Sequence, residues 1–321
     1  MIVKCRGQCS GFEAKGRLIL YVVTLVVYLF VVSYSFAAEK TIGVIMTGDI
    51  PYYKAIHKAF LEGLSAEGLG PGKVNIVLQT PAPEAVAWAN AARKLIAVDV
   101  NIIVAYGAPA TLAVINEASD IPVVFAGVYD PYVLGITGKN ATGISSKVPV
   151  ASVIKNLKGI SNFSKLGVVF NDAEKDTVKQ AEEVRQLEGQ FGFQSVRFNI
   201  KRLGDAAKIS NVDALFITTS CSAMQCVDNV VGVARKAKIP AATTISGGEE
   251  RGIILTIAAD PREQGKEAAE RVSKILGGAK PSTIPIEPPR KIEMVINLKE
   301  ATAIDLKVPF DILTSATKVI K

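Results

Sequence analysis

Several motifs that mark nucleotide-binding proteins and enzymes are missing from this 321-residue chain. It has no Walker A sequence, no Gly-x-Gly-x-x-Gly after the first predicted strand and no Gly-x-Ser-x-Gly. Its single histidine, His57, lies inside a predicted helix without a catalytic partner in the sequence around it. These absences argue against ATP or dinucleotide binding and against an enzyme built on histidine chemistry, and we expect no cofactor.

Cysteine is also scarce. Cys5 and Cys9 precede a long apolar run, and Cys221 and Cys226 are the other two. The later pair forms either a short-loop disulfide or two reduced thiols at a strand-to-helix turn, and the sequence leaves both open. Their spacing, with no histidine nearby, is not a zinc pattern. No cysteine follows the apolar run, which argues against a lipid anchor there.

Positive charge is not concentrated anywhere along the chain. The net charge is +7, but the first 37 residues hold four basic residues and one acidic residue, which leaves 33 basic against 29 acidic residues. Nucleic-acid binding needs a basic stripe or patch, and the lysines and arginines here are scattered. We therefore predict no nucleic-acid partner.

Only one long apolar run occurs, and it lies at the N-terminus. Four basic residues lead into the uncharged run Leu18–Val32, and the small-x-small sequence Ser35-Phe36-Ala37 follows. This order is typical of a secretory signal, so residues 1–37 are predicted to be an export segment that is cleaved, and the protein is predicted to work in the periplasm or otherwise outside the cytoplasm. The alternative is an uncleaved anchor, because the uncharged run extends over 19 residues to Phe36.

After residue 40 the chain alternates short apolar runs with amphipathic ones. The predicted strands are 42–46, 74–78, 102–105, 122–128, 166–170, 195–198, 214–218, 241–244, 253–258 and 293–297. The predicted helices include 53–64, 84–98, 176–191 and 262–276. Apolar runs without alternation suit strands that are buried on both faces of a parallel sheet. The pattern predicts an α/β fold of two doubly wound lobes, with a ligand cleft at the carboxyl ends of the strands.

The loops after the strands of the first lobe hold the candidate binding residues. Asp49, Tyr52 and Tyr53 follow the first strand. Tyr106 and the small-residue helix start Ala108-Pro109-Ala110-Thr111 follow the third, where free backbone N–H groups suit a carboxylate. Tyr129 and Asp130 follow the fourth, and the acidic side chain there suits an ammonium group. Each of these loops has a plain structural reading as well, as a cap or a tight turn.

In the second lobe, the turn Thr219-Ser220-Cys221-Ser222 follows the third strand and offers several hydroxyl groups for hydrogen bonds. Asn171-Asp172 follows the first strand of that lobe. We expect residues 219–222 to face the cleft. No metal site is predicted.

Many short segments, in this order, resemble the substrate-binding proteins of ABC transporters whose better-known members bind tryptophan and related amino acids. The segments include 55–64, 107–111, 120–126, 128–131, 140–145, 147–150, 212–216, 237–240, 251–252, 263–265, 277–281, 284–286 and 295–299. The likeness covers nearly all of the chain after the export segment, and it depends on the order and spacing of the segments rather than on one motif.

The resemblance implies a type I periplasmic-binding-protein fold, with one lobe at 40–147 plus 258–285 and the other at 148–257 plus 286–321. It implies a monomeric, non-enzymatic protein that closes on a small molecule, with an amino acid as the first candidate, and delivers it to an ABC permease in the inner membrane. A sensory receptor for a membrane kinase or chemoreceptor is the alternative. On this view the helix start at Pro109 takes a carboxylate, Asp130 an ammonium group, and a tyrosine flanks the ligand side chain.

Two turns depart from the family pattern at the predicted pocket. Many members have a Thr-Asp-Asn type of turn where this chain has residues 219–222, and a His-Pro turn where it has Asp49-Ile50-Pro51. The identity of the ligand therefore does not follow from the resemblance.

Overall fold

The computed structural model describes residues 40–117, 120–137 and 140–321. The predicted export segment, residues 1–37, lies outside these described residues. Within them, none of the helices is both long and apolar enough to cross a lipid bilayer.

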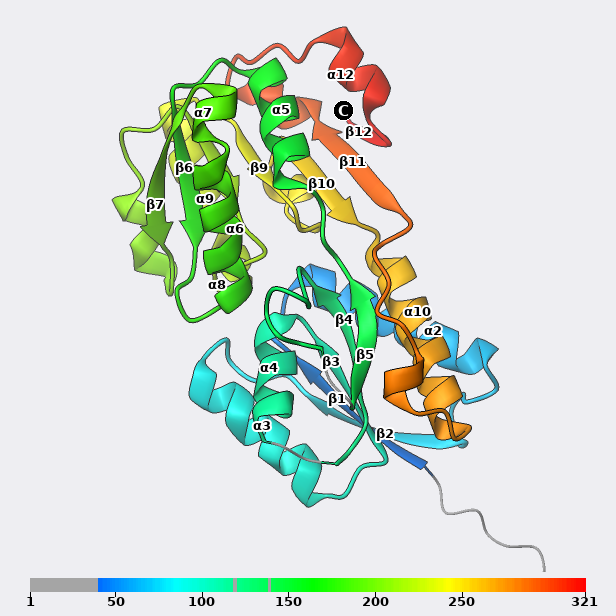
Figure 1. Cartoon of the computed structure of the whole chain (residues 1–321). Coiled ribbons are helices and arrows are strands. Elements are labelled where there is room, and N and C mark those ends of the chain that lie inside the picture. The colour runs from blue at the N-terminus through cyan, green and yellow to red at the C-terminus, as the bar shows by residue number, and fades with distance from the viewer. Residues whose placement is uncertain (1–39, 118–119, 138–139) are drawn as a thin grey trace, which may run out of the picture. The chain divides into compact units, whose positions relative to one another are not determined.

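The first lobe is built on a five-stranded parallel sheet with the strand order β2-β1-β3-β4-β5 (Figure 1). Its strands are β1 (Lys40–Met46), β2 (Val74–Gln79), β3 (Ile102–Tyr106), β4 (Val123–Val128) and β5 (Ala141–Ser145). All residues of β3, β4 and β5 are buried, which explains their apolar or small side chains.

Helices cover both faces of this sheet. They are α2 (Pro51–Ala66), α3 (Ala85–Ala97), α4 (Ala108–Asn116) and α10 (Pro261–Leu276). Helices α2 and α10 pack against each other on one face, and α3 and α4 lie on the other (Figure 1). Gly265 lets the two helices of the first pair approach closely, since a β-carbon there would lie 2.2 Å from the carbonyl oxygen of Ile56.

The second lobe is built on a seven-stranded sheet with the order β12-β11-β10-β9-β8-β6-β7. Its strands are β6 (Lys165–Phe170), β7 (Gln194–Asn199), β8 (Ala214–Ile217), β9 (Ala241–Thr243), β10 (Leu255–Ala259), β11 (Ile292–Asn297) and β12 (Lys318–Ile320). Its helices are α5 (Val150–Ile160), α6 (Lys175–Gln186), α7 (Glu188–Phe191), α8 (Cys221–Gln225), α9 (Val227–Ala237), α11 (Leu298–Ala303) and α12 (Phe310–Ser315). Short 3-10 turns occur at η1 (Leu203–Lys208), η2 (Glu249–Arg251) and η3 (Pro281–Thr283), the last of which packs on β5 in the first lobe.

The chain passes between the two sheets three times. The first crossing joins β5 to α5, and the second joins β10 in the second sheet to α10 on the first. The third follows Glu287, whose backbone pairs with β5, and leads into β11. These crossings fall close to the predicted boundaries at residues 147, 257 and 285, and the division into domains stays a prediction.

The predicted strands are present, and the two doubly wound lobes are confirmed. Strands β5 and β12 were not predicted, and the predicted helix 176–191 is divided into α6 and α7. Strand β11 runs antiparallel to β10, whereas the sequence pattern predicted parallel strands. The reason is topological, since β11 enters the second sheet from the crossing rather than from a helix on its own lobe. Cys221 and Cys226 are buried free thiols, so the disulfide alternative is wrong.

Candidate functional site

Each sheet has one point at which its strand order reverses, and these two points locate the site. In the first sheet the order reverses between β1 and β3, and in the second sheet it reverses between β6 and β8. Open α/β sheets bind ligands beyond the carboxyl ends of the strands at such a switch point. The loops there begin at Thr47 and Gly107 in the first lobe, and at Asn171 and Thr218 in the second.

These loops meet across the two lobes. A β-carbon on Gly48, after β1, would lie 2.5 Å from Sγ of Cys221, and one on Gly247, in the second lobe, would lie 2.9 Å from Cβ of Pro51. Helix α4 also contacts α6. The two switch points therefore face each other at close range.

The first-lobe half of the site is the start of α4. Gly107 precedes this helix with a φ of 87°, a conformation that favours glycine. Thr47 holds the turn, because its hydroxyl donates to the Tyr106 carbonyl at 2.8 Å and accepts from the Ala110 N–H at 3.3 Å. Pro109 has no N–H. Within the described part of the chain, the Ala108 N–H is therefore the donor of this turn that makes no hydrogen bond.

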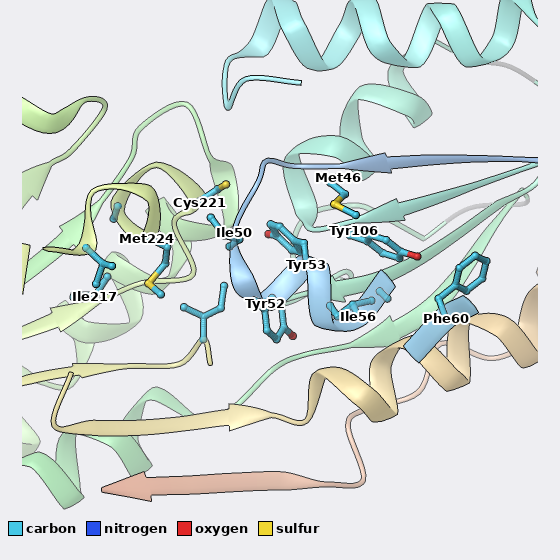
Figure 2. Packing of buried hydrophobic residues seen from close by; sticks show 14 of the residues in the cluster. Met46, Ile50, Tyr52, Tyr53, Ile56, Phe60, Tyr106, Ile217, Cys221 and Met224 are labelled. Carbon is cyan, nitrogen blue, oxygen red and sulfur yellow. The ribbon is translucent and has the colours of Figure 1, made fainter. Parts of the chain in front are cut away.

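Tyr53 lies beside this helix start. Figure 2 shows Tyr53 on the part of α2 that faces Cys221, and a β-carbon on Gly107 would lie 2.3 Å from the Tyr53 hydroxyl oxygen. Burial raises the pKa of Tyr53 well above its ordinary value, and the nearby Cys221, Asp176 and Glu174 add to the rise. Its hydroxyl therefore stays protonated and can donate a hydrogen bond.

The second-lobe half of the site contains two buried carboxyl groups that the sequence analysis missed. Glu174 fills the turn at the start of α8: it accepts from the N–H of Cys221 at 2.8 Å, the N–H of Ser222 at 3.2 Å and the hydroxyl of Ser220 at 3.0 Å. It also accepts from the Asn171 side chain at 3.2 Å. The predicted contact turn 219–222 thus binds a carboxylate that belongs to the protein itself.

Asp176 lies next to Glu174 and is only 2% exposed. Its Oδ2 accepts from the Thr219 hydroxyl at 3.0 Å, and Thr219 is held in turn by Gln180. Its Oδ1 is buried and makes no hydrogen bond in the described structure. Burial, and secondly the charge of Glu174, raise the pKa of Asp176 to about 7. We call Glu174 and Asp176 the acidic pair.

Asp130, the predicted ammonium ligand, has a partner of its own. Its Oδ2 lies 2.5 Å from Nζ of Lys147, and its Oδ1 accepts from the Val133 N–H at 3.1 Å. Tyr129 beside it donates to Oε2 of Glu183 on α6 at 2.8 Å. Residues 129 and 130 therefore form a polar link between the lobes near the first crossing.

The remaining predicted residues, Tyr106, Tyr52 and Asp49, make contacts with other parts of the protein. Tyr106 is fully buried and points toward Phe60, with its hydroxyl 3.2 Å from Nδ1 of His57 (Figure 2). Tyr52 is buried and contacts Ser146 through a side-chain hydrogen bond. Asp49 is exposed and pairs with Lys54 at 2.7 Å. It does not cap α2, whose N-cap residue is Ile50.

A small hollow of about 190 Å³ opens beside the start of α4. It is lined from the first lobe by Trp88, Pro109 and neighbouring residues of α3 and α4, and from the second by Ala173 and Lys175. Trp88 is fixed there, since its indole N–H donates to the Thr47 carbonyl at 2.7 Å.

The structure thus brings together Tyr53, the helix start 108–111, the turn 219–222 and the acidic pair. No group of three or more histidine, cysteine, aspartate or glutamate side chains in the described residues is placed to hold a metal ion. The arrangement offers hydrogen-bond donors in one lobe and carboxyl groups in the other.

Comparison with known proteins agrees with this architecture. A structure from Streptococcus pneumoniae, described as an ABC domain in complex with L-Trp, matches with a TM-score of 0.83 and 23% identity, over 88% of this chain and 100% of that one. A conserved domain protein from Vibrio cholerae matches with a TM-score of 0.84 and 23% identity, over 87% and 99%. A ligand-free, open substrate-binding protein with adhesive properties from Clostridium difficile matches with a TM-score of 0.63 and 22% identity, over 88% and 99%.

These likenesses show the type I periplasmic-binding-protein fold. A search of curated protein sequences gives no significant match. The family described as ABC transporter substrate binding protein matches residues 41–320, which is nearly the whole of the described chain. The chain therefore belongs to the ABC transporter substrate-binding protein family.

Proposed function

We propose that this protein captures an amino acid outside the cytoplasmic membrane and delivers it to the permease of an ABC importer. The observation that carries the proposal is the pairing of two topological switch points, one with free donors and the other with carboxyl groups. Such a pair suits a small zwitterion. The Streptococcus pneumoniae structure with L-Trp supports an amino acid as the first class to test.

The carboxylate of the ligand is proposed to bind at the start of α4. The Ala108 N–H and the Tyr53 hydroxyl lie there, and the positive end of the helix dipole adds to the attraction. The hollow beside Pro109 and Trp88 leaves room for part of a side chain. Thr111 stabilises the turn by donating to the Gly107 carbonyl at 2.8 Å.

Capture is proposed to occur by closure of the two lobes about the three crossings. A ligand shifts an open–closed equilibrium only through its different affinity for the two states. Contacts between the lobes set the balance before the ligand binds, and the hydrogen bond from Tyr129 to Glu183 is one of them. Lys147, which pairs with Asp130, also lies 4.0 Å from Glu183.

The function is tested by calorimetric titration of the purified protein with the twenty L-amino acids, with myo-inositol and glucose as sugar probes. We expect micromolar or tighter binding of one or a few amino acids, no turnover of the ligand, and a smaller radius of gyration in solution scattering with the ligand bound. Deleting the gene in its host should reduce uptake of that amino acid. Binding of a sugar and of no amino acid would overturn the proposal.

Closure has its own test in Glu183→Gln. If this bond stabilises the closed state, Glu183→Gln should weaken ligand binding by roughly 2- to 10-fold, since the amide oxygen can still accept from Tyr129 but a hydrogen bond to a charged group contributes about 1 kcal/mol more than one to a neutral group. Glu182→Gln is the matched control, because Glu182 is on the same helix and pairs with Arg197 of its own lobe at 3.5 Å. Equal affinities of the two variants would count against the link.

A further inference from the structure

The acidic pair is unusual because two buried carboxyl groups lie side by side without a positive partner. Glu174 and Asp176 are 1% and 2% exposed, and no ion pair joins either of them to a lysine or arginine among the described residues. The charged and titratable groups that face them are Tyr53 on α2 and Cys221 on α8, and neither carries positive charge. The pair therefore makes a region of negative potential at the switch point.

The two carboxyl groups differ in how well their oxygens are satisfied. Glu174 accepts hydrogen bonds from four donors around the start of α8. Asp176 uses one oxygen for Thr219. Its Oδ1 is buried and has no partner at good hydrogen-bond geometry, although the backbone N–H groups of Asp176 and Thr177 lie near enough to the carboxyl group to lower its pKa. A buried polar atom without a partner costs free energy and is rare in native structures. A donor from a bound molecule would satisfy this atom.

We propose that Asp176, supported by Glu174, binds the ammonium group of the ligand, so that the protein selects solutes that carry a primary amine. This inference rests on the proposed function and deepens it. Ammonium supplies up to three donors and one positive charge, which match the unpaired oxygen and the uncompensated negative charge. A metal ion fits less well, because the described residues around the pair do not form a metal-binding group.

Position supports the same assignment. Asp176 is in the first turn of α6, and α6 contacts α4, whose start holds the proposed carboxylate site. Tyr53 lies between the two, since its hydroxyl is close to Gly107 and its ring is close enough to the acidic pair for their charges to raise its pKa. The two proposed subsites therefore lie on helices that contact each other, as a ligand with adjacent amine and carboxylate requires.

Asp130 is the competing ammonium ligand, and its contacts disfavour it. Its Oδ2 already binds the ammonium group of Lys147, and its Oδ1 accepts a backbone N–H. A ligand amine would have to displace Lys147 to bind there. Asp176 needs no such displacement.

The experiment compares three L-amino acids with the acids that lack only the amine. The probes are leucine, phenylalanine and tryptophan, paired with 4-methylpentanoate, 3-phenylpropanoate and 3-indolepropanoate, and tryptamine tests an amine without a carboxylate. Each is titrated calorimetrically into the wild type, Asp176→Asn and Asp172→Asn. Asp172 is the matched control, because it is four residues from Asp176 in the same segment, exposed, and paired with Lys201 at 2.7 Å.

We expect the wild type to bind at least one amine-bearing probe and to bind its deaminated partner at least 20-fold more weakly. Asp176→Asn should lose at least 20-fold in affinity for the amine, and Asp172→Asn should stay within about 2-fold. The comparison of probes on the wild type needs no variant, so a folding defect in Asp176→Asn would not remove the test.

Two results overturn the inference in different ways. If an amino acid and its deaminated partner bind equally well, or if Asp176→Asn binds as the wild type does, the ammonium assignment is wrong while the proposed function stands. If no amine-bearing probe from this set or from the twenty amino acids binds the wild type, both fail. Binding of tryptamine alone would support the assignment and reject an amino acid as the ligand.

Discussion

The buried carboxyl group of Asp176 should make the unliganded protein less stable than a neutral replacement would. Burial and the neighbouring Glu174 raise its pKa from 3.8 to about 7. Between about pH 4 and pH 7 the folded chain keeps the proton that the unfolded chain releases, so the wild type loses stability as the pH rises through this window. A difference of about three pKa units corresponds to roughly 4 kcal/mol at most.

Asp176→Asn removes this titration. The new amide is buried and needs hydrogen-bond partners, which offsets part of the benefit. We therefore expect the free energy of unfolding at pH 8 to rise by about 2 kcal/mol, which raises Tm by roughly 4 to 8 °C. The gain should shrink as the pH falls and become a loss of roughly 2 kcal/mol below about pH 3, where the wild-type carboxyl group is protonated in both states and only the cost of the buried amide remains. Thermal unfolding followed by circular dichroism, without ligand, measures both effects.

The control is Asp172→Asn. Asp172 is exposed, and hydrogen bonding to Lys201 is the main reason that its pKa is lowered, so its replacement should give no rise in Tm at any pH. The reasoning about Asp176 is refuted if Asp176→Asn is less stable than the wild type at pH 8, or if its Tm gain is the same at pH 4 and pH 8.

Two further outcomes follow from the packing of the site. Gly107→Ala should lower the free energy of unfolding by at least about 2 kcal/mol, because φ is 87° and the added carbon would lie 2.3 Å from the Tyr53 hydroxyl oxygen. Gly72→Ala is the control: φ is 80° but the space around it is open, so the loss should be about 1 kcal/mol. Chemical denaturation measures both. Equal losses would contradict the close packing at Gly107. Cys221 and Cys226 should resist a thiol reagent such as Ellman's reagent at pH 8 in the native state, since burial raises the pKa of both, and should react together only in guanidinium chloride. Fast native labelling, or no reactive thiol after unfolding, would show that prediction to be wrong.

The sequence predicted the sheets well because their strands are buried on both faces. Runs such as Ile102–Tyr106 have no polar side that could be mistaken for a helix face, and they are bounded by turn residues. Strand β5 was not predicted because Ala141–Ser145 has two hydroxyl residues and a glycine in five positions, which is not an apolar run. The antiparallel direction of β11 was not predicted because it depends on where the chain crosses between the sheets, and no local sequence pattern indicates that.

The candidate site was predicted only in part. Small residues at the start of α4 have a local meaning, so the donor side was found from the loop itself. The partner of Asp130 was not, because Lys147 is 17 positions away and pairs with it only through the fold. The acidic pair was missed because acidic residues at a helix start have an adequate local explanation in helix polarity. Only the fold shows that these two side chains are buried and have no lysine or arginine partner among the described residues.

The location of Trp88 has a practical consequence. The chain contains one tryptophan, and its indole ring is buried with its N–H fixed to the carbonyl of Thr47, the residue that also holds the α4 turn. Any solute that settles against that turn, or any shift of α6 relative to α3, changes the surroundings of this single fluorophore. Its emission wavelength is therefore a built-in optical readout of occupancy, available in the unlabelled wild type for any ligand that has no indole of its own.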